Sequence, residues 1–353
     1  MACAQRVAAV AAVTVVVIGS FGAGAFGQSP GGTQGQSKAP DPPAEPRDEI
    51  TGEYVGTFTS PAGKVVPAVA CVAAERRRGQ KGQTHRASLR AVESGLIEKT
   101  VLGPKAKVVL SADLRGAAAG GVVALTGRDA TGRIAAGKLT AQVKGGTFAL
   151  ERFVRKSPTE LAPPPPGAVV LLPYEKGKAT SLAAWTYSRW PVFSDGSAMV
   201  KGGTNRTKRQ FRNFKLHLEF RIPMQSRGSG NSGVYILDRY EIQILNSFGR
   251  GPSKGSCAAV YQTFPPSANA SLPLGRWQTY DITFRAPKMA GDKAVKLPVV
   301  TVVHNGVTVH KDVEVPHATG NARSKGHAGS GPIQLQDHGN PVRFRNIWLQ
   351  EMK

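Results

Sequence analysis

A strict alternation of apolar and polar residues in the second half of the chain most constrains its fold. In "NFKLHLEFRIP" the apolar set is Phe214, Leu216, Leu218, Phe220 and Ile222, with polar or charged residues between them. A period of two places one kind of side chain on each face of a β-strand. A slip by one residue would turn the whole apolar set outward. The pattern therefore predicts strands with a well-specified register and one buried face.

The same pattern recurs towards the C-terminus. "VTVVHNGVTVHKDVEV" predicts a hairpin that closes near Asn305 and Gly306, because Asn-Gly favours a tight two-residue turn. "GPIQLQDHGNP" places Ile333 and Leu335 on one face and polar residues on the other. Because no helical stripe of useful length is present, we expect residues 167–353 to form two packed antiparallel sheets, as in a jelly-roll sandwich.

The first half of the chain has shorter strand patterns that are broken by glycine. "GKLTAQVKGGTFALERF" predicts a hairpin around Gly145 and Gly146. We therefore expect residues 48–162 to form a small antiparallel β domain, so that the whole protein is all-β. Four prolines at 163–166 predict a stiff spacer, and residues before Pro163 should be dispensable for the chemistry of the second domain.

The N-terminus is typical of an exported protein. Residues 1–27 combine Arg6, an uncharged apolar run over 7–18 and small residues before a cleavage point. The run is shorter than the roughly 20 residues that span a bilayer, and no other stretch is apolar enough. We expect secretion or a periplasmic or cell-envelope location, with no membrane span after the signal is removed. Residues 28–47, rich in Gly, Gln, Ser and Pro, predict a disordered tether.

The chain is strongly basic, with a formal charge of +23. Nucleic acid is not the expected partner, because no RRM, KH, zinc-finger or helix-turn-helix pattern is present and the chain looks exported. Between residues 201 and 254, eleven basic residues face three acidic ones. This excess indicates either a solvated basic face or a surface for an anionic polysaccharide.

The cysteines and histidines do not predict a metal centre. Cys71 and Cys257 are the cysteines that follow the signal, and two cysteines do not make a disulfide framework. They either pair or remain as two buried thiols. Zinc-ligand spacings such as CxxC and HExxH are absent. The sequence therefore predicts no cofactor and no metal, with a divalent cation left as an alternative.

One strand combines an apolar face with a single acid and an amide. In "YEIQI" the side chains of Glu241 and Gln243 share one face, opposite Tyr240, Ile242 and Ile244. A lone carboxylate on the outer face of a sandwich strand either pairs with a nearby base or belongs to a site.

Four segments in this order resemble the 3-keto-disaccharide hydrolase family, also known as domain of unknown function 1080. They are "RQFRNFKLHLEFRIP", "GNSGVYILDRYEIQILNSFG", "SANASLPLGRWQTYDITFRAP" and "GPIQLQDHGNPVRFRNIWL". The similarity covers roughly residues 167–353. It implies a concanavalin A-like jelly roll that acts on an oligosaccharide or polysaccharide, and hydrolase activity.

The resemblance places Glu241 and Gln243 in a concave carbohydrate groove. The strand is also similar to that of laminarinase-type glucanases, which carry an acid at each of three positions that here read Glu241, Gln243 and Asn246. Ordinary glycoside hydrolysis uses two carboxyl groups, and an amide can replace neither. A 3-keto sugar needs less, because the ketone acidifies the C2 proton, so that one base can start an elimination that water completes.

Candidate residues follow from this chemistry. Glu241 and His338 are the candidate base and acid, in an order that the sequence leaves open. The candidate substrate-binding residues, which would hold hydroxyls or a developing oxyanion, are Arg221, Asn231, Gln243, Asn246, Gln336 and Asp337. Asp337 has three alternative roles: a hydrogen-bond acceptor in the "QDHGNP" turn, a second acid, or a ligand, with Glu241 and His338, of a divalent cation.

Two other functions remain open on the sequence. A non-catalytic carbohydrate-binding module would need the same groove without the acid–base pair. An envelope scaffold would use the basic surface to hold an anionic polymer, and its binding would collapse with salt.

Overall fold

The computed structural model describes residues 40–45, 48–75, 83–187, 189–224, 226, 229–320, 322 and 324–353. The proposed signal and most of the proposed tether lie outside these residues. So do Arg76, Arg77 and Arg78, a basic run that is most simply predicted to be an exposed loop. Within them the chain forms 21 strands and no helix, which confirms the all-β prediction. None of the described residues forms a helix long and apolar enough to cross a membrane.

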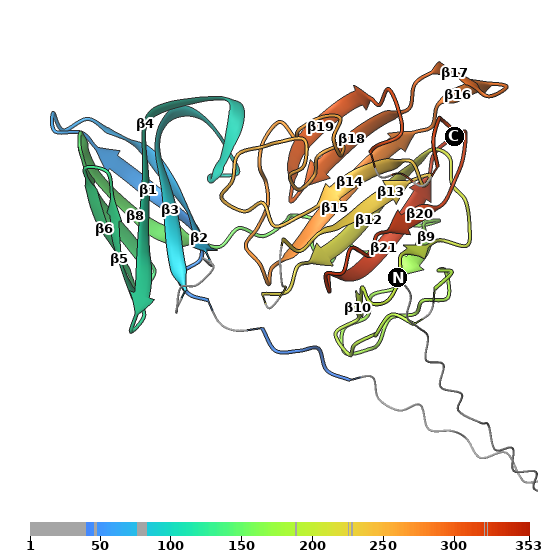
Figure 1. Cartoon of the computed structure of the whole chain (residues 1–353), viewed down its shortest axis with the longest axis horizontal. Helices are drawn as coiled ribbons and strands as arrows, with labels where there is room; N and C mark the ends of the chain where they lie inside the picture. Colours follow the sequence, from blue (N-terminus) through green and yellow to red (C-terminus); the bar gives the residue numbers. More distant parts are fainter. Residues whose placement is uncertain are drawn as a thin grey trace, which may run out of the picture. The chain divides into compact units, whose positions relative to one another are not determined.

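The first eight strands form a closed antiparallel barrel in which each strand pairs with the next and β1 closes against β8 (Figure 1). They are β1 (Gly52–Thr59), β2 (Val65–Glu75), β3 (Thr84–Ile97), β4 (Val101–Ala119), β5 (Val122–Gly127), β6 (Ala130–Ala135), β7 (Lys138–Val143) and β8 (Gly146–Phe153). The predicted hairpin is β7–β8.

Apolar side chains fill the barrel, as the alternation of its short strands requires. Leu139 faces Leu150 across the β7–β8 pair, and the rings of Phe58 and Phe148 lie 4.9 Å apart. Tyr54 is buried, and its hydroxyl donates to the carbonyl oxygen of Ile50 at 2.8 Å. The barrel interior is therefore a packed core.

The larger sheet of the second domain has seven strands in the order β10-β21-β12-β15-β18-β19, with β9 also paired to β21. Its strands are β9 (Val169–Leu172), β10 (Ala198–Met199), β12 (Phe214–Arg221), β15 (Trp277–Arg285), β18 (Val299–His304), β19 (Val307–Glu314) and β21 (Arg343–Glu351). Figure 1 shows β12, β15 and β21 side by side.

The smaller sheet has four strands in the order β11-β20-β13-β14. These are β11 (Asn205–Arg206), β20 (Ile333–Leu335), β13 (Ser232–Ile236) and β14 (Tyr240–Ile244). A separate hairpin consists of β16 (Lys288–Ala290) and β17 (Lys293–Lys296).

One hydrophobic core joins the inner faces of the two sheets. It contains the apolar set predicted for β12 together with Ile242 and Ile244 of β14. Tyr240 packs against Phe284 of the larger sheet with their rings 5.7 Å apart. The predicted sandwich of two antiparallel sheets is therefore present, with the register that the alternation specified. The predicted turn at Asn305 closes the β18–β19 hairpin.

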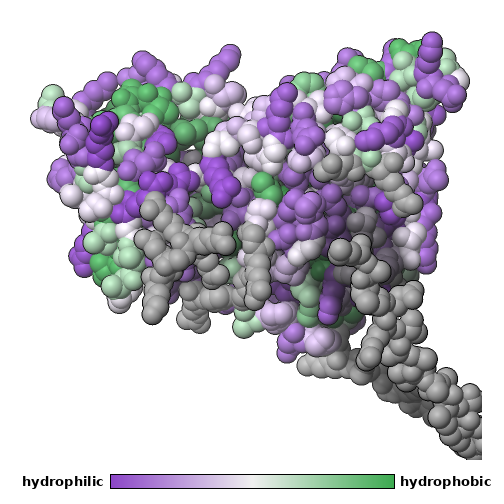
Figure 2. Space-filling model, in the orientation of Figure 1, coloured by the Kyte–Doolittle hydropathy of each residue, from purple (hydrophilic) through white to green (hydrophobic). Residues whose placement is uncertain are grey.

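Both described cysteines are free thiols. Burial raises the pKa of Cys71 to about 12, and burial also raises the pKa of Cys257, whose sulfur lies 3.1 Å from the Tyr280 hydroxyl. Neither thiol is therefore an activated nucleophile. The space-filling view shows hydrophobic residues as separate patches among hydrophilic ones on the face in view (Figure 2).

Candidate active site

The outer face of the smaller sheet carries a row of polar side chains that crosses all four strands. Arg206, Gln334, Tyr235 and Glu241 occupy matching positions on β11, β20, β13 and β14. Their neighbours along each strand point into the core, so alternation sends these four side chains outward. An Arg206 guanidinium nitrogen donates to the Gln334 side-chain oxygen, which ties one end of the row together.

Glu241 is the acid in this row, and it is only 2% exposed. It forms no ion pair with any described residue, so the pairing with a nearby base that the sequence allowed is not seen; Arg221 lies beside Glu45, and Arg239 donates to the Leu237 carbonyl oxygen. The Tyr235 hydroxyl donates to its Oε2 atom at 2.7 Å. Burial raises the pKa of Glu241 from 4.5 to about 7, although the hydrogen bond from Tyr235 lowers it. A carboxyl group with this pKa can both take and return a proton near neutral pH.

Gly233 makes the space that Glu241 occupies. A Cβ atom at position 233 would lie 2.4 Å from the Glu241 Oε1 atom and 3.0 Å from its Cγ and Cδ atoms. Gly233 faces Gln243 across the β13–β14 pair, and Glu241 leans towards it from the next row. A glycine is therefore needed here for room beside the carboxylate.

A second row of amides lies beside the first. Gln336 follows β20, and its backbone N–H donates to the Gly233 carbonyl oxygen at 2.9 Å, so the row continues across the sheet to Gln243. The side-chain oxygens of Asn231, Gln243 and Gln336 are buried and accept no hydrogen bond from any described residue. Buried amide oxygens normally have a donor. These three atoms could therefore accept hydrogen bonds from the hydroxyl groups of a sugar.

Tyr235 links the two rows, and it was not among the site residues predicted from the sequence. Its hydroxyl donates to Glu241 and accepts a hydrogen bond from the Gln336 Nε2 atom at 3.3 Å. Tyr235 stands two residues after Gly233 on the same face of β13. Alternation within "GVY" could have suggested this face, but the pairing with β14 decides it.

Three other predicted site residues lie in the segments that follow β20 and β14. His338 is exposed and lies two residues beyond Gln336, after the end of β20. Asp337 accepts from the backbone N–H groups of Gly203 at 2.7 Å and Gly339 at 2.8 Å, as a turn aspartate does. Asn246 is half-buried after β14, and its backbone N–H donates to the Ser229 carbonyl oxygen.

Arg221 does not join this group. It ends β12, in the larger sheet, and its neighbours Phe220 and Ile222 belong to the core. Its side chain therefore lies on the opposite face of the sandwich, where it stacks on Trp277. Sequence alternation placed Arg221 on a polar face but could not tell which sheet that face belonged to.

The described residues contain no group of three or more His, Cys, Asp or Glu side chains that could hold a metal ion. Glu241, Asp337 and His338 do not form such a group. The rows can instead supply one proton-transferring carboxyl group, one phenol and several amides.

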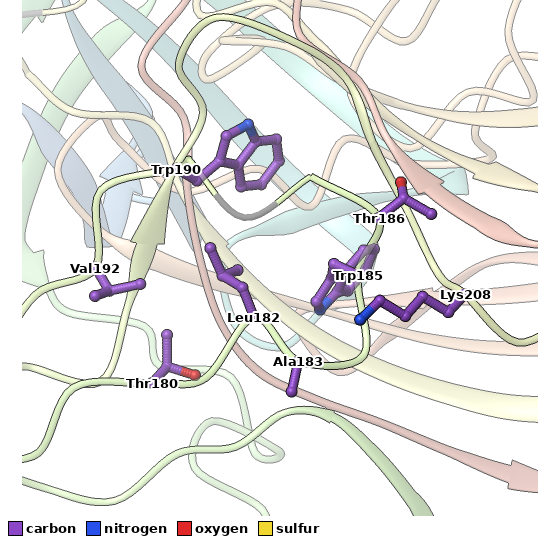
Figure 3. Close-up of a pocket in the computed structure, with 8 residues that line it drawn as sticks. All are labelled: Thr180, Leu182, Ala183, Trp185, Thr186, Trp190, Val192 and Lys208. Atoms are coloured by element: carbon purple, nitrogen blue, oxygen red, sulfur yellow. The ribbon is translucent and has the colours of Figure 1, made fainter.

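A cavity of about 380 Å³ lies elsewhere on the second domain (Figure 3). It is lined by Thr180, Leu182, Ala183, Trp185, Thr186, Trp190, Val192 and Lys208. Both tryptophan Nε1 atoms donate to backbone oxygens, of Leu171 and Gly203, at 2.8 Å. These rings are thus fixed by the fold, and the cavity includes none of the predicted site residues.

The second domain matches a known protein family. The family described as "3-keto-alpha-glucoside-1,2-lyase-like domain" matches residues 170–350, about half of the chain. No curated protein matched the chain.

Three solved structures from Parabacteroides distasonis ATCC 8503, each described as a "putative glycosyl hydrolase", are similar to it. One is 32% identical over 53% of this chain and 85% of that chain, with a TM-score of 0.49. Another is 20% identical over 52% and 99%, with a TM-score of 0.38. The third is 16% identical over 49% and 91%, with a TM-score of 0.36.

The family description names activity on a glucoside, which is that of carbohydrate-active proteins. By the match over residues 170–350, the chain belongs to the 3-keto-alpha-glucoside-1,2-lyase-like family, which is the resemblance that its sequence motifs predicted.

Proposed function

We propose that this protein is exported and cleaves 3-keto-glycosides, with Glu241 as the group that moves the C2 proton. The observation that carries the proposal is the buried Glu241 carboxyl group, which forms no ion pair with a described residue and whose pKa of about 7 suits a general base. The two rows hold no second carboxylate beside it, so an ordinary two-carboxylate mechanism is disfavoured. The family description names a lyase, which is an elimination enzyme, and it agrees with a one-base route.

In this route the Glu241 carboxylate takes the C2 proton of the sugar, and the electron pair is held as the enolate of the C3 ketone. The C3 carbonyl then re-forms, a C1–C2 double bond appears and the C1–oxygen bond breaks. The leaving oxygen takes a proton, for which exposed His338 is the proposed donor. Water then adds at C1 and gives a proton back to His338, while Glu241 returns its proton to C2, so that both groups regain their starting states.

The amides have the complementary task of binding the sugar. The unpaired side-chain oxygens of Gln243, Gln336 and Asn231 would accept from its hydroxyl groups, and their N–H groups would donate to the enolate oxygen. Tyr235 would hold the carboxylate of Glu241 in place through its 2.7 Å hydrogen bond.

A direct test is hydrogen exchange at C2. In D2O, the wild-type protein should exchange the C2 hydrogen of 3-keto-glucose for deuterium, and it should cleave 3-keto-disaccharides. Ordinary disaccharides serve as the comparison, and both reactions are measured with and without chelator. Glu241→Gln should lower both rates by about 100-fold or more, because it removes the proton-transferring group. Glu314→Gln, at an exposed glutamate of β19, is the matched control and should change neither rate.

The same assay separates the competing functions. Exchange and cleavage that persist in Glu241→Gln would remove Glu241 from the mechanism, and equal cleavage of ordinary disaccharides would remove the 3-keto requirement. Sugar binding without exchange or cleavage in the wild type would indicate a carbohydrate-binding module. Binding of an anionic polymer that disappears with salt would indicate a scaffold.

A further inference from the structure

Two arginines stand side by side on the outer face of the larger sheet. Arg221 of β12 lies directly opposite Arg343 of β21, and Trp277 of β15 stands on the other side of Arg221. Like charges directly opposite one another destabilise a sheet unless anions compensate them. The question is therefore which anions lie beside this pair.

The positive charge of Arg343 is partly compensated by groups within the second domain. Its side chain is 2% exposed, and its Nη2 atom donates to Asp195 at 2.7 Å. Its Nε atom donates to the Ser197 hydroxyl at 3.0 Å. Burial, followed by the charge of Arg221, lowers the pKa of Arg343 to about 10. Its Nη1 atom is buried and donates to no described residue.

Arg221 forms an ion pair with one described acid, which comes from the N-terminal segment, and the charge of Asp195 also acts on it. The Nε atom of Arg221 lies 3.8 Å from the Oε1 atom of Glu45 and makes no hydrogen bond. Its guanidinium lies over the Trp277 ring at 5.0 Å, and that of Arg345 lies over the same ring at 4.0 Å. Trp277 therefore contacts both guanidinium groups.

The segment that carries Glu45 is fixed at both ends. The Oε2 atom of Glu45 accepts from the Met224 backbone N–H at 2.9 Å. Five residues earlier, the Pro40 carbonyl oxygen accepts from the Ser194 N–H at 3.0 Å, and the Ser194 hydroxyl donates to Asp41. This part of the proposed disordered tether is thus held against the larger sheet by its two acids and one carbonyl group.

We infer that Arg221 and Arg343 form a carboxylate-binding site, and that Glu45 of the chain's own N-terminal segment is its resident ligand. A planar guanidinium matches a carboxylate with two parallel N–H donors. The unused N–H groups of Arg221 and Arg343 are where a carboxylate would bind. The segment 40–45 lies outside the family match at 170–350, so the family match does not account for this attachment.

The test is amide hydrogen exchange on the full chain. Glu45→Ala should speed exchange at the Met224 and Ser194 amides by about tenfold, the loss expected for one charge-assisted hydrogen bond that also anchors the segment. Glu45→Gln keeps an acceptor for Met224 but removes the charge, so its effect should be smaller. Glu49→Gln, at an exposed glutamate further along, is the matched control and should leave both amides unchanged.

A second arm distinguishes the chain's own carboxylate from a free one. Sodium glucuronate, with glucose as the neutral control, should raise the melting temperature of Glu45→Ala more than that of the wild type, and Arg221→Gln should abolish the difference. Equal exchange in wild type and Glu45→Ala would overturn the inference. Equal stabilisation of both proteins by glucuronate would show that Glu45 does not occupy the site. Neither arm depends on catalysis.

Discussion

Glu241→Gln should stabilise the protein at alkaline pH while it removes activity. Burial raises the pKa of Glu241 from 4.5 to about 7 in the folded protein, although Tyr235 lowers it. The folded state therefore binds this proton more tightly than the unfolded chain does. The stability that this protonated carboxyl group contributes is fully present below about pH 4.5. It is lost as pH rises to about 7, because the folded protein must then hold a buried charge.

The size of the effect follows from the difference between the two pKa values. A difference of about 2.5 pH units corresponds to about 3 kcal/mol, at 1.36 kcal/mol for each unit, as an upper bound. A neutral glutamine at 241 carries no charge at any of these pH values and still accepts from the Tyr235 hydroxyl. The variant should therefore gain most of this free energy above about pH 7 and none below about pH 4.5.

Urea unfolding of wild type, Glu241→Gln and the exposed control Glu314→Gln, from about pH 4 to about pH 9, measures this difference. The free energy of unfolding of Glu241→Gln should exceed that of the wild type by an amount that grows between about pH 4.5 and 7 and then levels off. A constant difference at every pH would refute the reasoning. So would a Glu241→Gln variant that is less stable than the wild type at about pH 8.

Two further substitutions test the surroundings of the carboxylate. Tyr235→Phe removes the hydrogen bond that lowers the pKa of Glu241. The acidic limb of the profile of kcat/KM against pH should therefore shift to higher pH by about one unit or more. Tyr240→Phe, on the core side of the sheet, should leave that limb in place. Gly233→Ala should fold but lower kcat/KM by about tenfold or more, because its Cβ displaces the flexible end of Glu241. A kcat/KM within about twofold of wild type would show that the carboxylate does not need this position.

Local alternation predicted which residues share a face, but it could not predict which strands become neighbours. It placed Glu241 and Gln243 opposite the core side chains of β14, as the structure does. It grouped Arg221 with them, yet β12 pairs with β15 and β21, far along the chain. The closure of the barrel by β1 and β8 is non-local in the same way. Such pairings depend on the whole chain and have no local signature.

The structure also makes the segment before the prolines a part of the sandwich surface. The Leu161 N–H donates to the buried carboxylate of Glu219 at 2.5 Å, and the Ala162 carbonyl oxygen accepts from the Asn346 side chain at 2.9 Å. A fragment that begins at Gly167 would lose both hydrogen bonds, and with them the acceptor at 3.2 Å for the Trp348 Nε1 atom. The carboxylate of Glu219 would keep Arg345 at 2.7 Å and Asn346 at 2.9 Å as partners.

Each lost hydrogen bond contributes about 0.5–1.5 kcal/mol, so that fragment should be a few kcal/mol less stable than one that begins at Arg155. The candidate site lies on the other sheet, so both fragments should cleave the same substrate with similar kcat/KM at a temperature where both are folded. Urea unfolding and the cleavage assay together check this. Equal stability of the two fragments would show that the segment is only a spacer, whereas activity in the longer fragment alone would show that the larger sheet's outer face takes part in the chemistry.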